Sequence, residues 1–173
     1  MATMILLPDA TGLSLPDWVA VGETYHHQSL DDDNGATSYS KCSTNSKEMT
    51  IEYANPSVAE ADIASIESVR FLSSGKAVHR TDPSLVAISF YRPTDGFAET
   101  VSYDAHRTNF ETINGTARTT SDGSSAWTYS NLEDLEMRCV KSATIEVYLS
   151  YLALEVTYTE AAADNSVFFG CNF

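Results

Sequence analysis

Apolar residues along this chain alternate with polar ones at a period of two, and short groups of turn residues interrupt the alternation. The pattern is typical of half-buried β-strands, because successive side chains of a strand point to opposite faces. Such an apolar face must be covered by a second sheet. The sequence therefore predicts an all-β fold, namely a two-sheet antiparallel sandwich of the jelly-roll type. The expected inward-facing residues are Val19, Val21, Met49, Ile51, Tyr53, Val86, Ile88, Phe90, Phe97, Val101 and Tyr103. Polar residues between them, such as Glu52, Ser89 and Ser102, are expected to face solvent.

Turn residues divide several of the expected strands. Pro93-Thr94-Asp95-Gly96 lies between two alternating runs, 84–92 and 97–104. Proline and glycine in this arrangement favour a tight reversal, so the two runs are predicted to form a hairpin. Ser73-Ser74-Gly75 predicts a second reversal, which would separate the apolar residues before it from those after it.

The segment 143–159 is longer than a usual strand, and its apolar phase changes within it. Apolar residues occupy odd positions up to Tyr151 and even positions from Leu152 onward. A regular strand cannot bury both sets on one face. A β-bulge or bend between Ser150 and Ala153 would reconcile them, and the alternative is that a subunit contact buries both faces.

One short helix is predicted near residues 130–137. Ser130 and Glu133 have the spacing of a capping box, and Leu132 with Leu135 forms an apolar pair on one helical face. Residues 57–66 could form another turn of helix.

The chain has 173 residues, which is enough for one ordinary domain. We expect an N-terminal arm over 1–17, a sandwich over 18–159 and an apolar C-terminal tail over 160–173. Exposed termini are normally polar, so apolar ends indicate docking, either on the protein's own surface or on a neighbouring subunit. The expected interaction residues are Ile5, Leu6, Leu7, Leu13, Phe168, Phe169 and Phe173.

Charge narrows the class of partner. Ten basic residues against 24 acidic ones give a formal net charge of -14. Such a chain repels nucleic acid and anionic lipid, so neither is an expected partner. The N-terminal residues lack the basic region of a signal peptide, and we expect synthesis in a cytoplasm.

Residues with catalytic or metal-binding chemistry do not form a motif. The acidic run 31–35 lacks the ligand spacing of a calcium loop, and His26-His27, on an expected strand, would point to opposite faces. We find no nucleophile elbow and no phosphate-binding loop. Cys42, Cys139 and Cys171 are expected to be buried thiols, and Trp127 a core residue. The sequence thus predicts no catalytic residues, no metal and no cofactor.

Three segments, taken in order, resemble a group of small virion proteins of tailed bacteriophages. The first is an acidic turn with a short strand over 30–39, and the second is the strand 63–71. The third and most specific is the turn and helix Ser124-Ser125-Ala126-Trp127-Thr128-Tyr129-Ser130-Asn131-Leu132-Glu133-Asp134-Leu135-Glu136, followed by a strand ending at Tyr158. The glycine that usually follows the helix in this group is absent, since Met137-Arg138 follows Glu136.

The resemblance implies a jelly-roll structural protein without catalytic residues. The favoured function is a capsid decoration (cement) protein on the outer surface of a phage head. Its partners would be the major capsid protein and its own neighbouring copies, in a homotrimer. The alternative is a neck, tail or fibre component, with Tyr91, Tyr129 and Trp18 as candidate receptor- or glycan-binding aromatics. A glycan hydrolase would need a convergent pair of carboxylates in a groove.

Overall fold

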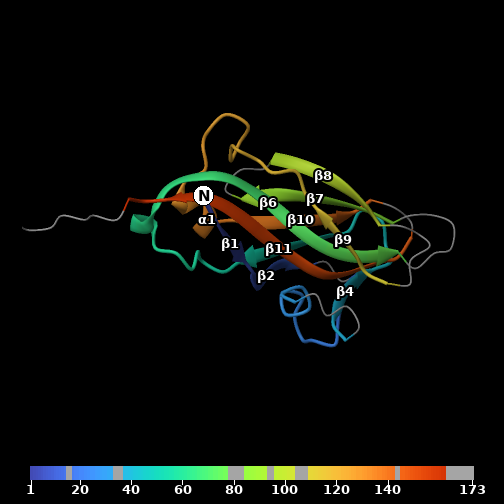
Figure 1. Cartoon of the computed structure of the whole chain (residues 1–173). Coiled ribbons are helices and arrows are strands. Elements are labelled where there is room, and N and C mark those ends of the chain that lie inside the picture. The colour runs from blue at the N-terminus through green and yellow to red at the C-terminus, as the bar shows by residue number, and fades with distance from the viewer. Residues whose placement is uncertain are drawn as a thin grey trace, which may run out of the picture.

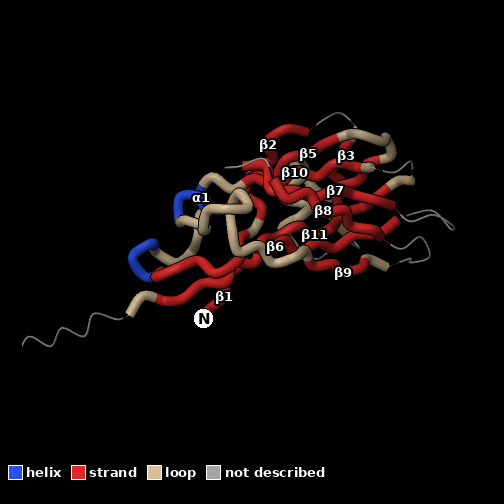
Figure 2. Tube along the Cα trace, turned by 90° about the horizontal axis from the view of Figure 1, so that it is seen from above, coloured by secondary structure: helices blue, strands red, loops and turns tan. Residues whose placement is uncertain are grey.

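A computed structural model describes residues 1–14, 17–32, 37–77, 84–92, 96–103, 109–142 and 145–162. Almost all of the regular structure in these ranges is β-strand (Figures 1 and 2). The elements are β1 (Ala2–Leu6), β2 (Pro8–Ser14), β3 (Trp18–Val21), β4 (Tyr39–Cys42), β5 (Glu48–Tyr53), the 3-10 helix η1 (Glu60–Asp62), β6 (Ile63–Ala77), β7 (Ser84–Arg92), β8 (Gly96–Tyr103), β9 (Glu111–Asn114), α1 (Tyr129–Glu133), β10 (Glu136–Lys141) and β11 (Val147–Glu160).

The strands form two antiparallel sheets packed face to face, which confirms the predicted all-β sandwich. The first sheet has the order β3-β4-β11-β6-β9, and β1 pairs with β11 beside β4. The second sheet has the order β2-β5-β10-β7-β8. The predicted hairpin is present as β7 and β8, which pair from Ser84 opposite Tyr103 to Phe90 opposite Gly96. The expected turn residues 93–95 lie outside the described residues.

The N-terminal residues belong to both sheets. Strand β1 joins the first sheet and β2 joins the second, so the chain crosses the sandwich at Leu7. The Leu7 carbonyl accepts a hydrogen bond from Ala54 N at 3.0 Å, which fixes the crossing. Residues 2–14 are thus part of the sandwich, and the expectation of an arm outside it is wrong for them. Their pairing partners lie far along the chain, where local sequence carries no signal of them.

The longest contact between two strands joins β6 and β11. Their register shifts between Leu149 and Tyr151, which is the β-bulge predicted for this segment. Because of it, Val147 and Leu149 before the bulge and Leu152 and Leu154 after it are all buried. The change of apolar phase is therefore resolved within the strand, without a subunit contact.

Strand β6 runs without a break through Ser73-Ser74-Gly75, so the reversal predicted there is wrong. A Cβ atom on Gly75 would lie 2.6 Å from Tyr103 Cζ, so the glycine makes room for a tyrosine of the opposite sheet. The Ser73 hydroxyl donates a hydrogen bond to Ile113 O at 2.8 Å. Gly75 thus serves packing between the sheets, and Ser73 joins β6 to β9 of the same sheet. The sequence alone reveals neither role.

The core contains the expected side chains of β5, β7 and β8, with the exception of Phe97, whose side chain lies outside the described residues. The alternation of β3 is the reverse of the prediction. Trp18 points inward at 3% exposure, and Val19 faces outward at 46%. The Trp18 indole N–H donates to Lys47 O at 3.1 Å, which holds the larger ring in the core position. Ser89, expected to face solvent, is also buried.

Helix α1 is shorter than predicted and is capped two residues earlier. Thr128 is the N-cap: its hydroxyl accepts from Asn131 N at 3.2 Å, and Asn131 Oδ1 accepts from Thr128 N at 3.0 Å. The predicted pair Leu132 and Leu135 is buried. The chain then enters β10, where alternate residues are buried, and so the helix does not reach residue 137. The helical turn expected over 57–66 is limited to η1, and β6 begins directly after it.

Candidate interaction surface

The histidines and thiols of the described residues have structural roles. His26-His27 lies in a turn, not on the expected strand. His26 is buried, and its Nδ1 lies 2.9 Å from Ser40 Oγ. Burial, with a smaller contribution from the charge of His27, lowers the pKa of His26. Cys42 and Cys139 are buried as expected, and burial raises the pKa of Cys139 to about 12. His79, His106 and Cys171 lie outside the described residues.

No cluster of three or more histidine, cysteine or acidic side chains in the described part of the chain could hold a metal ion. The acidic run 31–35 is described only at Asp31 and Asp32. Within the same ranges, no helix is long and apolar enough to cross a membrane.

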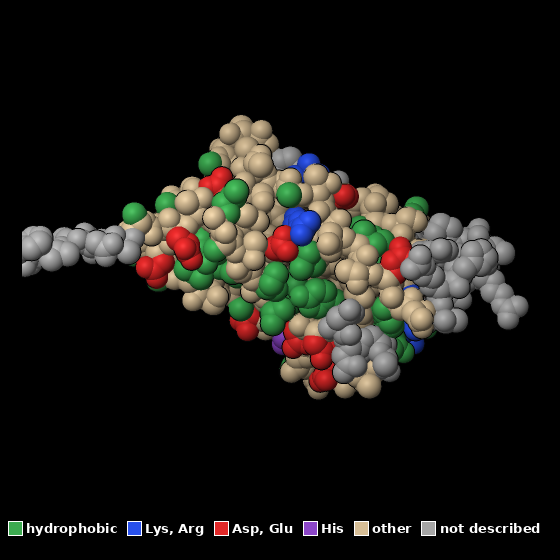
Figure 3. All heavy atoms as spheres, in the orientation of Figure 1, with side chains coloured by type: hydrophobic (Ala, Val, Ile, Leu, Met, Phe, Trp, Pro, Cys, Tyr) green, Lys and Arg blue, Asp and Glu red, His purple; other side chains and the backbone are tan. Residues whose placement is uncertain are grey.

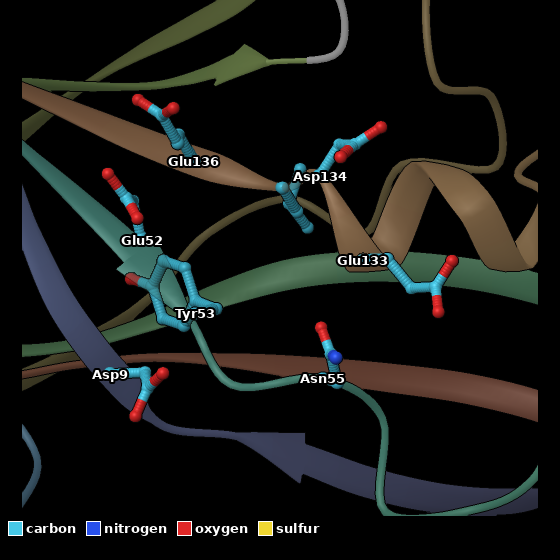
Figure 4. A pocket seen from close by; sticks show the side chains of 8 residues that line it. Asp9, Glu52, Tyr53, Asn55, Glu133, Asp134 and Glu136 are labelled. Carbon is cyan, nitrogen blue, oxygen red and sulfur yellow. The ribbon is translucent and has the colours of Figure 1, made fainter.

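An open pocket of about 700 Å³ lies where β2, β5 and β10 meet the end of α1. It is lined by Asp9, Glu52, Tyr53, Asn55, Glu133, Asp134, Leu135 and Glu136. The Tyr53 hydroxyl donates to Leu152 O at 2.9 Å and so belongs to the core. The carboxylates of Glu133 and Asp134 point in different directions, and neither meets that of Asp9 (Figure 4). Glu52 and Glu136 lie opposite each other on β5 and β10, and their side chains extend to the same side (Figure 4). The pocket is an open acidic surface, and the five carboxylates that line it do not all meet at one point.

The first seven residues carry an unusual amount of exposed apolar surface. They hold three of the five large apolar side chains that are exposed among the described residues, namely Met1 at 94%, Ile5 at 42% and Leu7 at 42%. Met4 and Leu6 point the other way and are buried. Apolar side chains gather over the face that carries β1 and β11, with carboxylates around them (Figure 3). Exposed apolar side chains that gather on one face in this way are typical of an interaction site.

Strand β1 also presents an open backbone edge. It pairs with β11 in an unbroken register from Ala2 opposite Tyr158 to Leu6 opposite Leu154. On its other side, no described strand pairs with it. Its residues Ala-Thr-Met-Ile-Leu include no charge and no proline. Natural proteins use charged residues, proline, bulges or short length to prevent an edge strand from pairing with another chain.

The other described edge strands carry such protection. Strand β2 includes Pro8 and Asp9, and its register with β5 is irregular at two places. Strand β8 includes Glu99, and its register with β7 is also irregular. Strand β9 has four residues and includes Glu111, and β3 is uncharged but likewise has four residues. Among the described edges, β1 is therefore the best suited to accept a further strand.

The interaction residues predicted from the sequence fall into three groups: exposed, buried, and outside the described residues. Ile5 and Leu7 are exposed, and their role as contact residues stays a prediction. Leu6 is 2% exposed, so its prediction as a contact residue is wrong, because a strand turns neighbouring side chains to opposite faces. Leu13 lies in β2, and its side chain is outside the described residues. Phe168, Phe169 and Phe173 also lie outside them.

An aromatic cluster with one lysine covers the outer face of the first sheet. Tyr39 packs edge-on against Tyr148 with ring centroids 4.8 Å apart, and Phe110 lies 6.3 Å from Tyr39. The Lys76 ammonium lies 4.6 Å from the Phe110 centroid and 5.4 Å from that of Tyr148. The Tyr148 hydroxyl donates to Glu146, and burial together with this bond raises its pKa to about 12. All four clustered side chains are half-buried.

Sequence reasoning missed this cluster and named other aromatics. Trp18 and Trp127 are buried. Tyr91 carries the Arg138 guanidinium 5.1 Å from its ring centroid, and Tyr129 donates to Val58 O at 3.1 Å. The alternation of β11 holds the missed signal, because Tyr148 falls between the inward-facing Val147 and Leu149.

Comparison with known proteins adds little to this geometry. No protein-family model matches the chain, and no curated protein matches it. Among solved structures, the chain is similar to one described as "CBM4 structure and function", with a TM-score of 0.37 and 12% sequence identity. That match covers 84% of this chain and 95% of the other.

Proposed function

We propose that this chain is a structural subunit of a tailed-bacteriophage virion, and specifically a decoration protein on the outer surface of the head. The observation that carries the proposal is β1, an uncharged edge strand with exposed Ile5, which exposed Leu7 directly follows. The other described edges of the sandwich are short, charged or irregular. A decoration protein needs such a surface to bind the shell and its own neighbours. Many weak contacts of this kind become strong together when they repeat over a shell.

The charge distribution supports the same proposal. With a net charge of -14, the chain is unsuited to a lumen packed with DNA and suited to an outer surface. Contact with a partner requires a place where this charge is locally absent. Residues 1–7 contain no acidic or basic side chain.

The segment with the most specific resemblance to virion proteins closes one end of the sandwich. The Trp127 indole N–H donates to Arg118 O at 2.8 Å, and its ring meets Phe90 edge-on with centroids 5.5 Å apart. Thr128 then caps α1. These contacts give the segment a packing role within the sandwich.

The proposal is tested by counting the copies of this protein in purified particles of the virus that encodes it. Mass spectrometry against the major capsid protein should find hundreds of copies per particle. A dozen or fewer copies per particle would instead indicate a neck, tail or fibre component. Absence of the protein from the particles would overturn a virion role. The trimer implied by the resemblance is checked by light scattering of the purified protein.

A second function, binding of a glycan receptor, is favoured by the aromatic cluster of Tyr39, Phe110, Tyr148 and Lys76. Sugars stack on aromatic rings, and the lysine adds a hydrogen-bond donor beside them. This function suits a tail or fibre component more than a decoration protein.

A glycan array separates the two functions. Glycan binding by the natural protein, together with its loss in Tyr39→Ala, would support the receptor-binding function. Tyr91→Ala serves as the matched control on the opposite sheet. Absence of binding to any glycan on the array would remove this second candidate.

A further inference from the structure

Two lysines flank Tyr148 on the outer face of the first sheet. Tyr148 of β11 lies directly opposite Lys41 of β4 on one side and directly opposite Lys76 of β6 on the other. Residues directly opposite each other in an antiparallel pair point to the same face of the sheet. Two strand spacings, about 10 Å, separate the backbones of the two lysines. A row of one aromatic ring between two cations therefore crosses three strands.

Neither lysine of this row has a carboxylate partner in the described part of the chain. The ion pairs found there use other cations, namely Lys47, Arg70 and Arg118. The Lys76 ammonium lies over the rings of Phe110 and Tyr148 instead. With 24 acidic residues against ten basic ones, carboxylates are abundant in this chain, and yet none is placed to neutralise the row. The two half-buried lysines can thus bind an anion from outside the protein.

One carboxylate lies at the edge of the row. Glu146 Oε2 accepts a hydrogen bond from the Tyr148 hydroxyl at 2.9 Å. This bond fixes the hydroxyl end of the ring, and the negative charge of Glu146 repels an anion from that end. An anionic group of a ligand is therefore expected at the two ammonium groups and not at the hydroxyl.

The net charge of -14 does not prevent an anion from binding at this row. Exposed charges are screened beyond about 8–10 Å at physiological salt, so the nearest charges dominate. On the row these are Lys41, Lys76 and Glu146, whose sum is positive. The second sheet differs, because Glu52 of β5 lies directly opposite Glu136 of β10. An anion is thus expected to bind the first sheet and to avoid the second.

We infer that the row binds an acidic glycan, with a sugar ring packed against the aromatic cluster and a carboxylate or sulfate group bound by the Lys41 and Lys76 ammonium groups. Tyr39, Phe110 and Tyr148 supply the aromatic surface. Each ammonium group supplies hydrogen-bond donors, and bonds between two charged groups are the strong ones. The inference rests on the second function proposed above, glycan binding, and names the class of glycan.

An array that carries each acidic glycan beside its neutral counterpart tests the inference on the natural protein. Suitable pairs are sialyllactose with lactose, oligogalacturonate with its methyl ester, and sulfated with unsulfated galactose oligomers. The first two pairs test a carboxylate and the third tests a sulfate. We expect the acidic member of at least one pair to bind about tenfold more tightly, because it alone forms charge-assisted hydrogen bonds. Added salt should reduce this preference.

Variants of the two lysines locate the site. Lys41→Gln and Lys76→Gln should each reduce the preference for the acidic member and leave the affinity for the neutral member unchanged, and the double variant should abolish the preference. The matched control is Arg138→Gln, since the Arg138 guanidinium lies 5.1 Å from the ring centroid of Tyr91 on the second sheet. It removes the same charge beside an aromatic ring, and the preference should persist.

Equal binding of the acidic and neutral members of every pair would overturn the inference and leave glycan binding by the aromatic cluster standing. A preference that persists in Lys41→Gln/Lys76→Gln would also overturn it, because the anionic group would then bind elsewhere. Binding to no glycan at all would overturn both the inference and the second proposed function. None of these results depends on virions, so the copy-number test of the decoration function is unaffected.

Discussion

The hydroxyl of Tyr103 donates a hydrogen bond to Ser73 Oγ at 2.9 Å, and this bond joins β8 of one sheet to β6 of the other. Tyr103 is fully buried, and burial raises its pKa. A polar contact between the two inner faces restricts how the sheets can slide, because an unpaired hydroxyl in the core is costly.

Replacing Tyr103 with phenylalanine should therefore reduce the free energy of unfolding by about 1 kcal/mol, the usual net value of one buried hydrogen bond. Urea unfolding followed by fluorescence measures the loss. Tyr25→Phe is the matched control, because Tyr25 is 56% exposed. Its effect should stay within about 0.5 kcal/mol. Equal effects of the two variants would contradict the role of the Tyr103 bond.

Gly75→Ala should destabilise the sandwich by about 1–3 kcal/mol through overpacking. The added methyl group would lie 2.6 Å from Tyr103 Cζ and 2.9 Å from Leu149 Cδ2. Combining it with Tyr103→Leu removes the clashing ring, so the double variant should lose less stability than the sum of the single ones. Strict additivity in thermal unfolding would show that the two sites do not touch.

Trp127→Ala should cost about 3–5 kcal/mol, because the change removes a large ring from the core and leaves a cavity. The ring is 4% exposed and packs on Phe90. Trp127→Phe keeps part of the packing but loses the bond to Arg118 O, and should cost less. A loss below about 1 kcal/mol for Trp127→Ala would be inconsistent with a core position.

His26 predicts a loss of stability in mild acid. Its lowered pKa means that, as pH falls through about 6.5, unfolded chains bind a proton at this residue before folded chains do. The free energy of unfolding should thus fall more steeply between pH 7 and pH 5 in the natural protein than in His26→Gln. Acidic residues contribute equally to the pH dependence of the free energy of unfolding in both proteins. Identical slopes for His26→Gln and natural protein would refute the prediction.

Deleting residues 167–173 should leave a folded sandwich and weaken association. The unfolding temperature should change little, because the described strands of both sheets end at or before Glu160. Light scattering should show a shift toward monomer. Ile5→Lys should have the same effect on association, while Val19→Lys, at a similarly exposed valine of β3, should not. An unchanged oligomeric state in both the deletion and Ile5→Lys would count against a role of these ends in assembly.

Much of the candidate interaction surface could be predicted from composition, but its shape could not. The apolar character of residues 1–7 is visible in the sequence, and Ile5 and Leu7 are indeed exposed. Whether these residues form a free arm or an edge strand depends on pairing with β11, about 150 residues away. The aromatic cluster was missed for the same reason, since Tyr39 and Tyr148 come from strands that only the sheet brings together.

The sequence by itself determined the all-β sandwich, the β7–β8 hairpin and the bulge near Ser150. These follow from side-chain alternation and turn residues, which are local properties of a strand. Only the tertiary structure decided that Ser73-Ser74-Gly75 lies inside a strand and that Trp18, not Val19, faces the core. The reason is physical: the space available to Gly75 is set by Tyr103, and which side of β3 is buried is set by the sheet opposite. Long-range packing of this kind overrides local preference, because burial of a large ring outweighs the propensity of a few residues.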